Sequence, residues 1–234
     1  MYGYYGGFYY DWTYLLVLAG MVLCLLASAS VKMTFNRYAK VQSMSHMTGA
    51  QVAERILREN GITDVAVVRT SGSLTDHYNP KTNTVNLSDS TYGSTSVAAI
   101  AVAAHECGHV CQHYEKYTPI EVRSALVPIA NIGSNLGIPV IIIGLVMGAF
   151  QPLIWIGIIM FSAGVLFQIV TLPVEFNASN RALKMLTSYG ILGTDEERDA
   201  SKVLRAAALT YVAAAASSIM QLIRLILLSK RRND

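Results

Sequence analysis

The feature of the sequence that most constrains the fold is a run of 51 residues, 124–174, without a charged side chain. Two strongly apolar segments lie within it, residues 138–149 and 153–172, and the glycine and proline of residues 148–152 predict a tight turn between them. Because about 20 apolar residues suffice for a helix to cross a bilayer, the run is long enough for two crossings. Such a membrane hairpin returns the chain to the side from which it came.

A second uncharged segment, residues 12–31, predicts a first transmembrane helix. A cleaved signal peptide is the competing interpretation, but no basic residue precedes the apolar segment. Lys32, Arg37 and Lys40 follow it at once, so the positive-inside rule places the N-terminus on the non-cytoplasmic side. Residues 1–10 are rich in tyrosine and glycine and predict an aromatic belt at the membrane interface, with a disordered tail as the alternative.

The composition agrees with a membrane protein, because 53% of the residues are hydrophobic and only 14% are charged. The formal net charge is +3, which gives no indication of nucleic-acid binding. Cys24 lies in the first membrane segment, while Cys107 and Cys111 lie within a predicted helix, so the three do not form a disulfide framework. Cys107 and Cys111 are interpreted as packing residues.

Between the first crossing and the hairpin, the sequence predicts a small water-exposed region with a sheet. Thr48 and Gln51 have the spacing of a capping box and open an amphipathic helix. Residues 65–68 form a short β-prone run, and residues 74–78 and 84–87 flank a turn-rich link, which predicts a hairpin. A free edge of this sheet would suit an extended peptide, and the alternative is a sheet that only covers the neighbouring helix.

Residues 94–114 predict a helix that carries the pattern His-Glu-Cys-Gly-His. His105 and His109 are four residues apart, so both imidazoles lie on one helix face about one turn apart and can share one metal ion. Glu106 lies beside the first histidine, where its carboxylate can act as a general base toward a water molecule. This is the H-E-x-x-H arrangement of zinc peptidases, and a core helix with internally satisfied polar residues is the alternative.

A catalytic zinc ion needs a third protein ligand, which this pair of histidines does not supply. His113 is eight residues beyond the first histidine, about 12 Å along a helix, and is too far away. Glu115 stands where a longer H-E-x-x-H scheme has its third ligand, and the rest of that scheme does not fit. His46 and His77 remain possible third ligands. Glu175 is favoured, because it opens a predicted helix at residues 175–189 just as the hairpin leaves the membrane on the side of the histidines.

Five sequence motifs together resemble those of the YugP-type family of membrane zinc metallopeptidases: Leu74-Thr-Asp-His-Tyr78, His105-Glu-Cys-Gly-His109, Ser124-Ala-Leu-Val-Pro128, Asn131-Ile-Gly-Ser-Asn135 and Thr171-Leu-Pro-Val-Glu175. The resemblance covers nearly the whole chain. More distantly, the chain is similar to HtpX-type membrane proteases, whose zinc ligands are two histidines and one glutamate. The resemblance implies His105, His109 and Glu175 as ligands and Glu106 as general base. Asn177 and Ser179 depart from acidic residues expected in these families, which affects the surroundings of the ligands.

The C-terminal part contains another apolar stretch, residues 206–228, with Arg224 inside it. A fourth crossing would carry Lys230 and the two arginines after it to the non-cytoplasmic side, against the bias of the other basic residues. A helix packed along the catalytic region or lying in the interface is therefore preferred. A true fourth span is the alternative.

These observations predict a mainly α membrane protein (α+β) with a gluzincin-like catalytic core, a small β-sheet and three or four transmembrane helices. Four segments are expected: residues 1–31 with the first crossing, residues 32–123 with the catalytic region, the hairpin of residues 124–173, and residues 174–234 with the third ligand.

The expected function is hydrolysis of peptide bonds by a zinc-activated water with Glu106 as base and one Zn²⁺ per chain. His77, Asn131 and Asn135 are candidate donors to the transition state. We expect peptide or membrane-protein substrates, a place in the lipid bilayer of the cell membrane, and an active site on the cytoplasmic side. The alternative functions are a catalytically silent, metal-containing adaptor that regulates another protease, and, less favoured, a metal permease.

Overall fold

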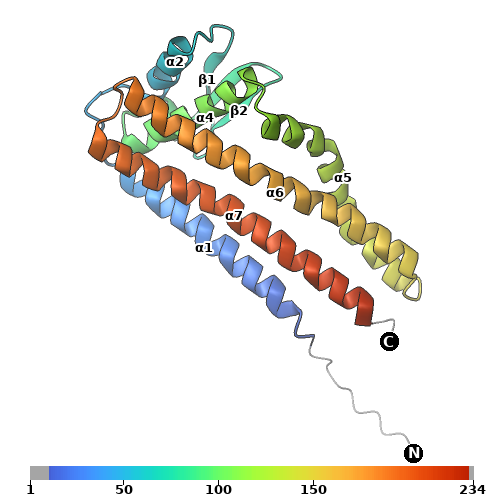
Figure 1. The fold of residues 1–234 in the computed structure, drawn as a ribbon. Helices are drawn as coiled ribbons and strands as arrows, with labels where there is room; N and C mark the ends of the chain where they lie inside the picture. The colour runs from blue at the N-terminus through green and yellow to red at the C-terminus, as the bar shows by residue number, and fades with distance from the viewer. Residues whose placement is uncertain (1–10, 232–234) are drawn as a thin grey trace, which may run out of the picture.

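Three long helices lie side by side along most of the molecule in the computed structural model, which describes residues 11–231 (Figure 1). They are α1 (Tyr14–Tyr38), α6 (Gln151–Ser188) and α7 (Thr194–Arg231). A fourth long helix, α5 (Thr118–Val146), forms a hairpin with α6. The aromatic belt expected at residues 1–10 lies outside the described residues.

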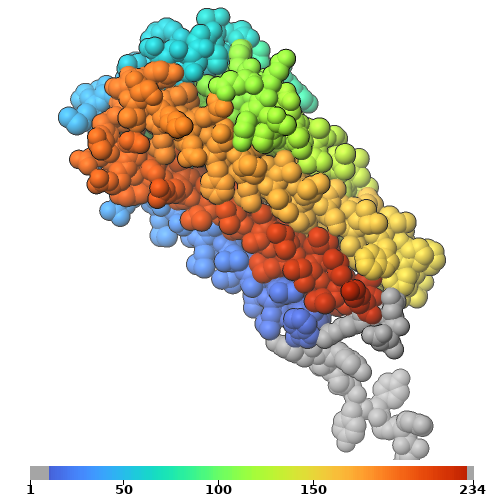
Figure 2. Space-filling view, in the orientation of Figure 1, coloured from blue at the N-terminus to red at the C-terminus, as the bar shows by residue number. Residues whose placement is uncertain are grey.

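These four helices, α1, α5, α6 and α7, are long and apolar enough to cross a membrane, counted over the described residues. Their outer surfaces carry many exposed large apolar side chains, which suit a surrounding of lipid. The space-filling view shows the resulting elongated shape, with residues of the sheet region gathered at one end (Figure 2). The chain is therefore a membrane protein, and its hairpin and first crossing are where the sequence predicts them.

Helix α7 contains residues 206–228 and packs against α1, α4 and α6. It runs antiparallel to α1, because the Lys202 ammonium lies 5.6 Å from the Tyr38 ring at one end, and Gly20 faces Ser217 toward the other. Helix α1 therefore has α7 as its partner along its length (Figure 1). The length and apolar composition of α7 suit a fourth span, and its contact with α4 agrees with the expected packing along the catalytic region.

Arg224, the charged residue inside this apolar stretch, is paired in the structure. Its guanidinium lies 3.7 Å from the Asp11 carboxylate and 4.2 Å from the centre of the Tyr14 ring. A paired cation stacked on an aromatic ring costs less to hold at an apolar depth than an isolated one. Its partners, Asp11 just before α1 and Tyr14 at the start of α1, are far away in the sequence, so the residues around Arg224 do not reveal this pairing.

A three-stranded sheet caps one end of the bundle, with strand order β1-β3-β2. The elements of this region are α2 (Gly49–Glu59), β1 (Ala66–Thr70), β2 (His77–Asn79), β3 (Thr84–Ser88), α3 (Asp89–Tyr92) and α4 (Val97–Tyr114). Strand β3 pairs parallel with β1 and antiparallel with β2, which confirms the predicted hairpin. The capping box at the start of α2 is confirmed as well.

Helix α4 is the central helix of the main hydrophobic core. It packs against α2, the sheet, α6 and α7, and most of its side chains are buried. Its run of small apolar residues allows close approach on several sides. Cys107 faces α2, with its thiol 3.7 Å from the Ala53 carbonyl oxygen, and Cys111 lies 3.9 Å from the Met185 sulfur. Both cysteines therefore pack in the core, as predicted.

Helix α6 is continuous through Pro173, so the helix predicted to begin at Glu175 in fact begins at Gln151. A proline inside a membrane helix removes one backbone hydrogen bond, which neighbouring helices can compensate. Glu175 consequently lies in the interior of a long helix rather than at a helix start. This places its carboxylate on a rigid element that crosses α4.

Candidate metal centre

The three ligands proposed from the sequence meet in the structure. The Nε2 atom of His105 lies 3.3 Å from the Oε2 atom of Glu175, and the Nε2 atom of His109 lies 3.5 Å from the same oxygen. One ligand atom from each residue falls within 4.8 Å of the others. Among the described residues, this is the group of His, Cys, Asp or Glu side chains that could hold a metal ion.

The close crossing of α4 and α6 produces this convergence. Gly108 lies between the two histidines and faces the backbone of α6, where an added Cβ would come 2.6 Å from the carbonyl oxygen of Ala178. Only glycine permits this approach. The third ligand, three residues before Ala178 on α6, is thereby brought opposite the two imidazoles of α4.

The chemistry of these side chains fits a bound divalent cation. Glu175 is only 2% exposed, and its Oε2 atom has no hydrogen-bond partner. Its Oε1 atom lies 3.8 Å from the Arg123 guanidinium. A buried carboxylate oxygen without a donor is costly, and a cation between it and the imidazoles would remove that cost. Two imidazole nitrogens and one carboxylate oxygen form a ligand set found in catalytic zinc sites.

Gln112 orients His109 from the side opposite to Glu175. Its Oε1 atom lies 3.0 Å from the Nδ1 atom of His109, and its Nε2 group donates to the Val174 carbonyl (2.8 Å) and to the Asn177 Oδ1 atom (2.9 Å). With Nδ1–H donated to Gln112, the Nε2 atom of His109 keeps its lone pair for a metal. Asn177, which departs from the expected acidic residue, completes this buried network.

Ser179 takes the corresponding place beside His105. Its hydroxyl oxygen lies 3.2 Å from the Nδ1 atom of His105 and can accept the proton of that nitrogen. Both departures from the expected families therefore lie next to the ligands and are replaced there by neutral hydrogen-bonding groups. Each imidazole presents its Nε2 atom to Glu175 because a neighbour holds the other ring nitrogen.

The electrostatics of the site favour positive charge. Burial lowers the pKa of the His109 imidazole, but the adjacent Glu175 carboxylate and the charge of Glu106 outweigh burial, and its pKa is raised overall. The Glu106 and Glu175 carboxylates therefore stabilise a cation at this position. A divalent metal ion bound here would supply the positive charge that a proton on His109 otherwise supplies.

Glu106 is held in place by the sheet. It is 7% exposed, and its Oε2 atom accepts a hydrogen bond of 2.9 Å from the Tyr78 backbone N–H in β2. Its Oε1 atom has no hydrogen-bond partner among the described residues. The segment before β2 is anchored by Asp76, whose carboxylate accepts from the Ser88 N–H (2.7 Å) and hydroxyl (2.9 Å). The edge of β2 thus positions the carboxylate of Glu106.

A cavity of about 290 Å³ lies over the site and contains Glu106 and all three candidate ligands. His77 lines it, as predicted for a donor, but Asn131 and Asn135 do not line it and lie on the exposed surface of α5. His113 also lines the cavity, with its ring edge-on to Tyr78, and is outside the possible metal group. His46 is exposed on a distant loop.

Arg123 and Tyr211 line this cavity with polar groups, and neither was predicted from the sequence as a site residue. Arg123 is the last charged residue before the uncharged run. Its position at the start of the hairpin, on the same side as Glu175, could have indicated that it lies near the site. Tyr211 belongs to α7, whose path along the site was not predicted. The tyrosine lies in an alanine-rich segment, and nothing in its spacing points to the histidines.

Comparisons with known proteins agree with this geometry. A family model described as "Putative neutral zinc metallopeptidase" matches residues 13–230. The chain belongs to this family of zinc metallopeptidases. It is 45% identical to a protein of Bacillus subtilis (strain 168) named "Putative membrane protease YugP". The matched region of 219 residues covers 94% of this chain and 97% of that protein. No solved structure matches the chain.

Proposed function

We propose that this protein is a membrane-embedded zinc metalloendopeptidase that holds one Zn²⁺ per chain. The observation that carries the proposal is the meeting of His105, His109 and Glu175 around one point, with Glu106 beside them. Family membership supports the same class of activity. The arrangement has the ligands, the carboxylate and the adjoining cavity that hydrolysis of a peptide bond requires.

In this proposal Glu106 is the general base. A zinc ion held by the three ligands would polarise the scissile carbonyl group and lower the pKa of a water molecule toward about 7. The Tyr78 N–H fixes one oxygen of the Glu106 carboxylate, and the other oxygen takes the proton of the attacking water. The same carboxylate then delivers this proton to the leaving amine.

The developing negative charge on the substrate oxygen needs a donor, and three residues of the cavity can supply one. His77 was expected from the sequence, and Arg123 and Tyr211 are added by the structure. Arg123 lies 3.8 Å from the Glu175 carboxylate, and the Nδ1 atom of His77 lies 2.9 Å from the Thr75 carbonyl oxygen, so each of these two groups already has a partner in the structure. Asn131 and Asn135 are not used in this mechanism.

We further propose that the site faces the cytoplasm and cleaves peptides or membrane proteins at the bilayer surface. The hairpin of α5 and α6 begins and ends on the side that carries α4, and the basic residues at the C-terminal end of α1 mark this side as cytoplasmic. In a four-span arrangement, the start of α1 and the end of α7 would lie on the opposite side.

Two measurements test the proposal. Purified chain should contain about one zinc ion, and His105→Ala should lose it; a metal content unchanged by this variant would contradict the site. Comparison of membrane proteomes should show cleavage products with the native chain but not with Glu106→Gln, while the matched Glu54→Gln change on the exposed face of α2 retains them. Products that persist with Glu106→Gln would support the silent-adaptor alternative instead.

A further inference from the structure

We propose that a second cavity, beside Glu106 and between α1, α4 and α7, binds a large apolar side chain of the substrate next to the scissile bond. This inference rests on the proposed peptidase function and adds the class of sequence that is cleaved. The cavity has a volume of about 230 Å³.

The position of this cavity relative to the catalytic groups is the first argument. It shares Asp76, His105, Glu106 and Tyr211 with the cavity that contains the metal ligands. His105 and Glu106 line both cavities, so the two cavities meet at these residues. Their other lining residues differ, so the cavities extend from there in different directions. A substrate bound with its scissile bond at Glu106 would therefore place neighbouring side chains in one or the other.

The linings of the two cavities differ in chemistry. The second cavity is walled mainly by aliphatic and aromatic side chains from three helices and the segment before β2: Val31, Phe35, Leu74, Val102, Val203, Leu204 and Ala207. The cavity that contains the candidate metal ligands is also lined by His77, His113 and Arg123. The apolar preference is thus expected on one side of the scissile bond and not on the other.

The volume of the second cavity suits a complete large side chain. An apolar cavity of about 150 Å³ can hold a benzene molecule. At about 230 Å³, this cavity has room for phenylalanine, leucine or methionine, whose burial is favourable in proportion to the apolar area removed from water. A carboxylate would enter unpaired beside the negative charges of Asp76 and Glu106 and is disfavoured.

The membrane gives a reason for this specificity. Val31, in the wall of the cavity, is the last residue of the uncharged stretch of α1, and Lys32 follows it. The cavity consequently lies near the boundary between lipid and water, where membrane proteins expose chain segments rich in apolar residues. We expect the substrate to be an extended segment of this kind.

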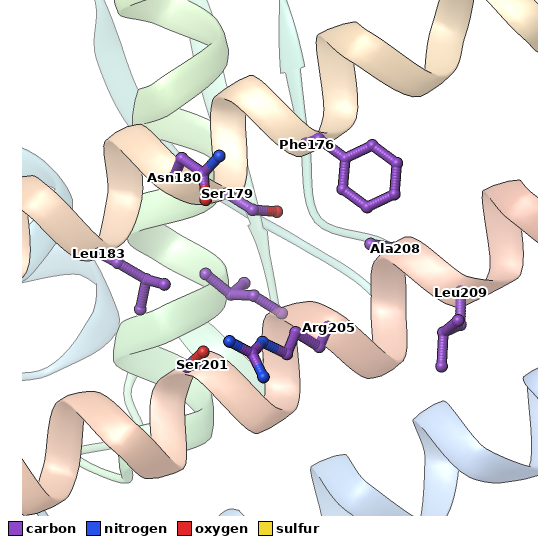
Figure 3. Close-up of a pocket in the computed structure, with 9 residues that line it drawn as sticks. Phe176, Ser179, Asn180, Leu183, Ser201, Arg205, Ala208 and Leu209 are labelled. Carbon is purple, nitrogen blue, oxygen red and sulfur yellow. The ribbon is translucent and has the colours of Figure 1, made fainter.

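A larger cavity of about 360 Å³ lies between α6 and α7, but it does not compete for this role. Figure 3 shows Ser179 and Phe176 on its α6 side and Arg205 and Leu209 on its α7 side. Glu106 does not line it, and its contact with the metal site is limited to Ser179. A peptide bond placed there would not reach the catalytic carboxylate.

The proposal is tested by changing the size of the second cavity. Ala207→Leu fills it from α7, and Ala216→Leu is the matched control, because it introduces the same side chain on the same helix in a lateral groove against α1. Leu74→Ala removes a wall residue that is 41% exposed, so this second variant alters the cavity with little risk to folding. Zinc content verifies the metal site in each variant.

Cleavage profiling with a mixed peptide library should show an apolar preference on one side of the cleaved bond. Ala207→Leu should reduce kcat/KM for a phenylalanine-containing peptide about tenfold relative to an alanine-containing one, since side-chain pockets discriminate to this extent. Leu74→Ala should weaken the preference, and Ala216→Leu should leave it unchanged. A profile without apolar preference, or one that Ala207→Leu does not alter, would overturn the proposal.

A binding measurement separates this inference from the proposed activity. Full-length, zinc-loaded Glu106→Gln protein should bind a fluorescent decapeptide with a central phenylalanine about tenfold more tightly than its alanine counterpart, and Ala207→Leu should remove the difference. If this discrimination is found but the native chain cleaves no peptide, the apolar site stands and the peptidase proposal fails. Equal binding of both peptides would contradict the apolar site itself.

Discussion

Replacement of Gly108 by alanine tests whether the contact between α4 and α6 sets the metal site. The new Cβ would lie 2.6 Å from the Ala178 carbonyl oxygen and 3.1 Å from two further backbone atoms, where ordinary contact begins at 3.4 Å. These atoms belong to a helix backbone and cannot rotate away, so the helices must separate by about 0.8 Å. The ligand atoms of α4 and α6 then separate as well.

The sign of the effect on stability makes this variant decisive. In a helix without this contact, Gly→Ala would stabilise the protein by about 1 kcal/mol through helix propensity. Overpacking against a rigid backbone costs about 1–3 kcal/mol, and the closeness of the contact favours the upper part of that range, so we expect a net loss of about 1–2 kcal/mol. Misplaced ligands should lower zinc affinity by about 10–100-fold, as do other changes around metal ligands.

Zinc affinity can be measured by competition with a chromogenic chelator, and stability by thermal unfolding of the purified protein in detergent. Gly93→Ala is the matched control, because an added Cβ there meets no atom within 4 Å and the backbone φ is −97°. It should leave both quantities unchanged. A Gly108→Ala variant that is stabilised, with native zinc affinity, would refute the role of this crossing.

Three further outcomes are expected. Gln112→Leu should lower zinc affinity about 10–100-fold, measured by the same competition, because His109 loses the acceptor that orients it. The Arg181 guanidinium lowers the pKa of the Glu115 carboxyl, so this pair stabilises the protein above pH 4.5 and the contribution is lost as the pH falls through the lowered pKa. Because the pair is solvent-exposed, Glu115→Gln should cost less than about 1 kcal/mol at pH 7 and nothing in strong acid, checked by thermal unfolding at both pH values. A cysteine placed at Lys230 should react with a membrane-impermeant reagent from outside the cell, and protection there would contradict the fourth span.

The sequence was sufficient to predict the parts of the site that depend on local spacing and on topology. The four-residue interval between His105 and His109 defines one helix face whatever the tertiary fold. Glu175 followed from the even number of crossings between it and the histidines, which brings both to one side of the membrane. These two arguments use covalent connectivity and helix geometry, which the sequence contains directly.

The remaining features depend on contacts between helices, which no local pattern encodes. Tyr211 reaches the site only because α7 lies along α1, and Arg224 within α7 is paired with Asp11, which precedes α1. The helix start predicted at Glu175 was wrong for a similar reason, because α6 continues through Pro173 and neighbouring helices can compensate the lost hydrogen bond. The partners of His105 and His109 were unpredictable for the same reason.

The continuity of α6 fixes the distance between the candidate metal ligand Glu175 and the start of the helix. Glu175 is 24 residues after Gln151, where α6 begins, which corresponds to about 36 Å along the helix axis. The hydrocarbon core is about 30 Å thick, so with Gln151 at the far boundary the ligand emerges only just beyond the near one. In the proposed peptidase, this length of α6 would keep the metal site close to the lipid surface. Peptide bonds held well away from the membrane on a folded domain would then not reach it.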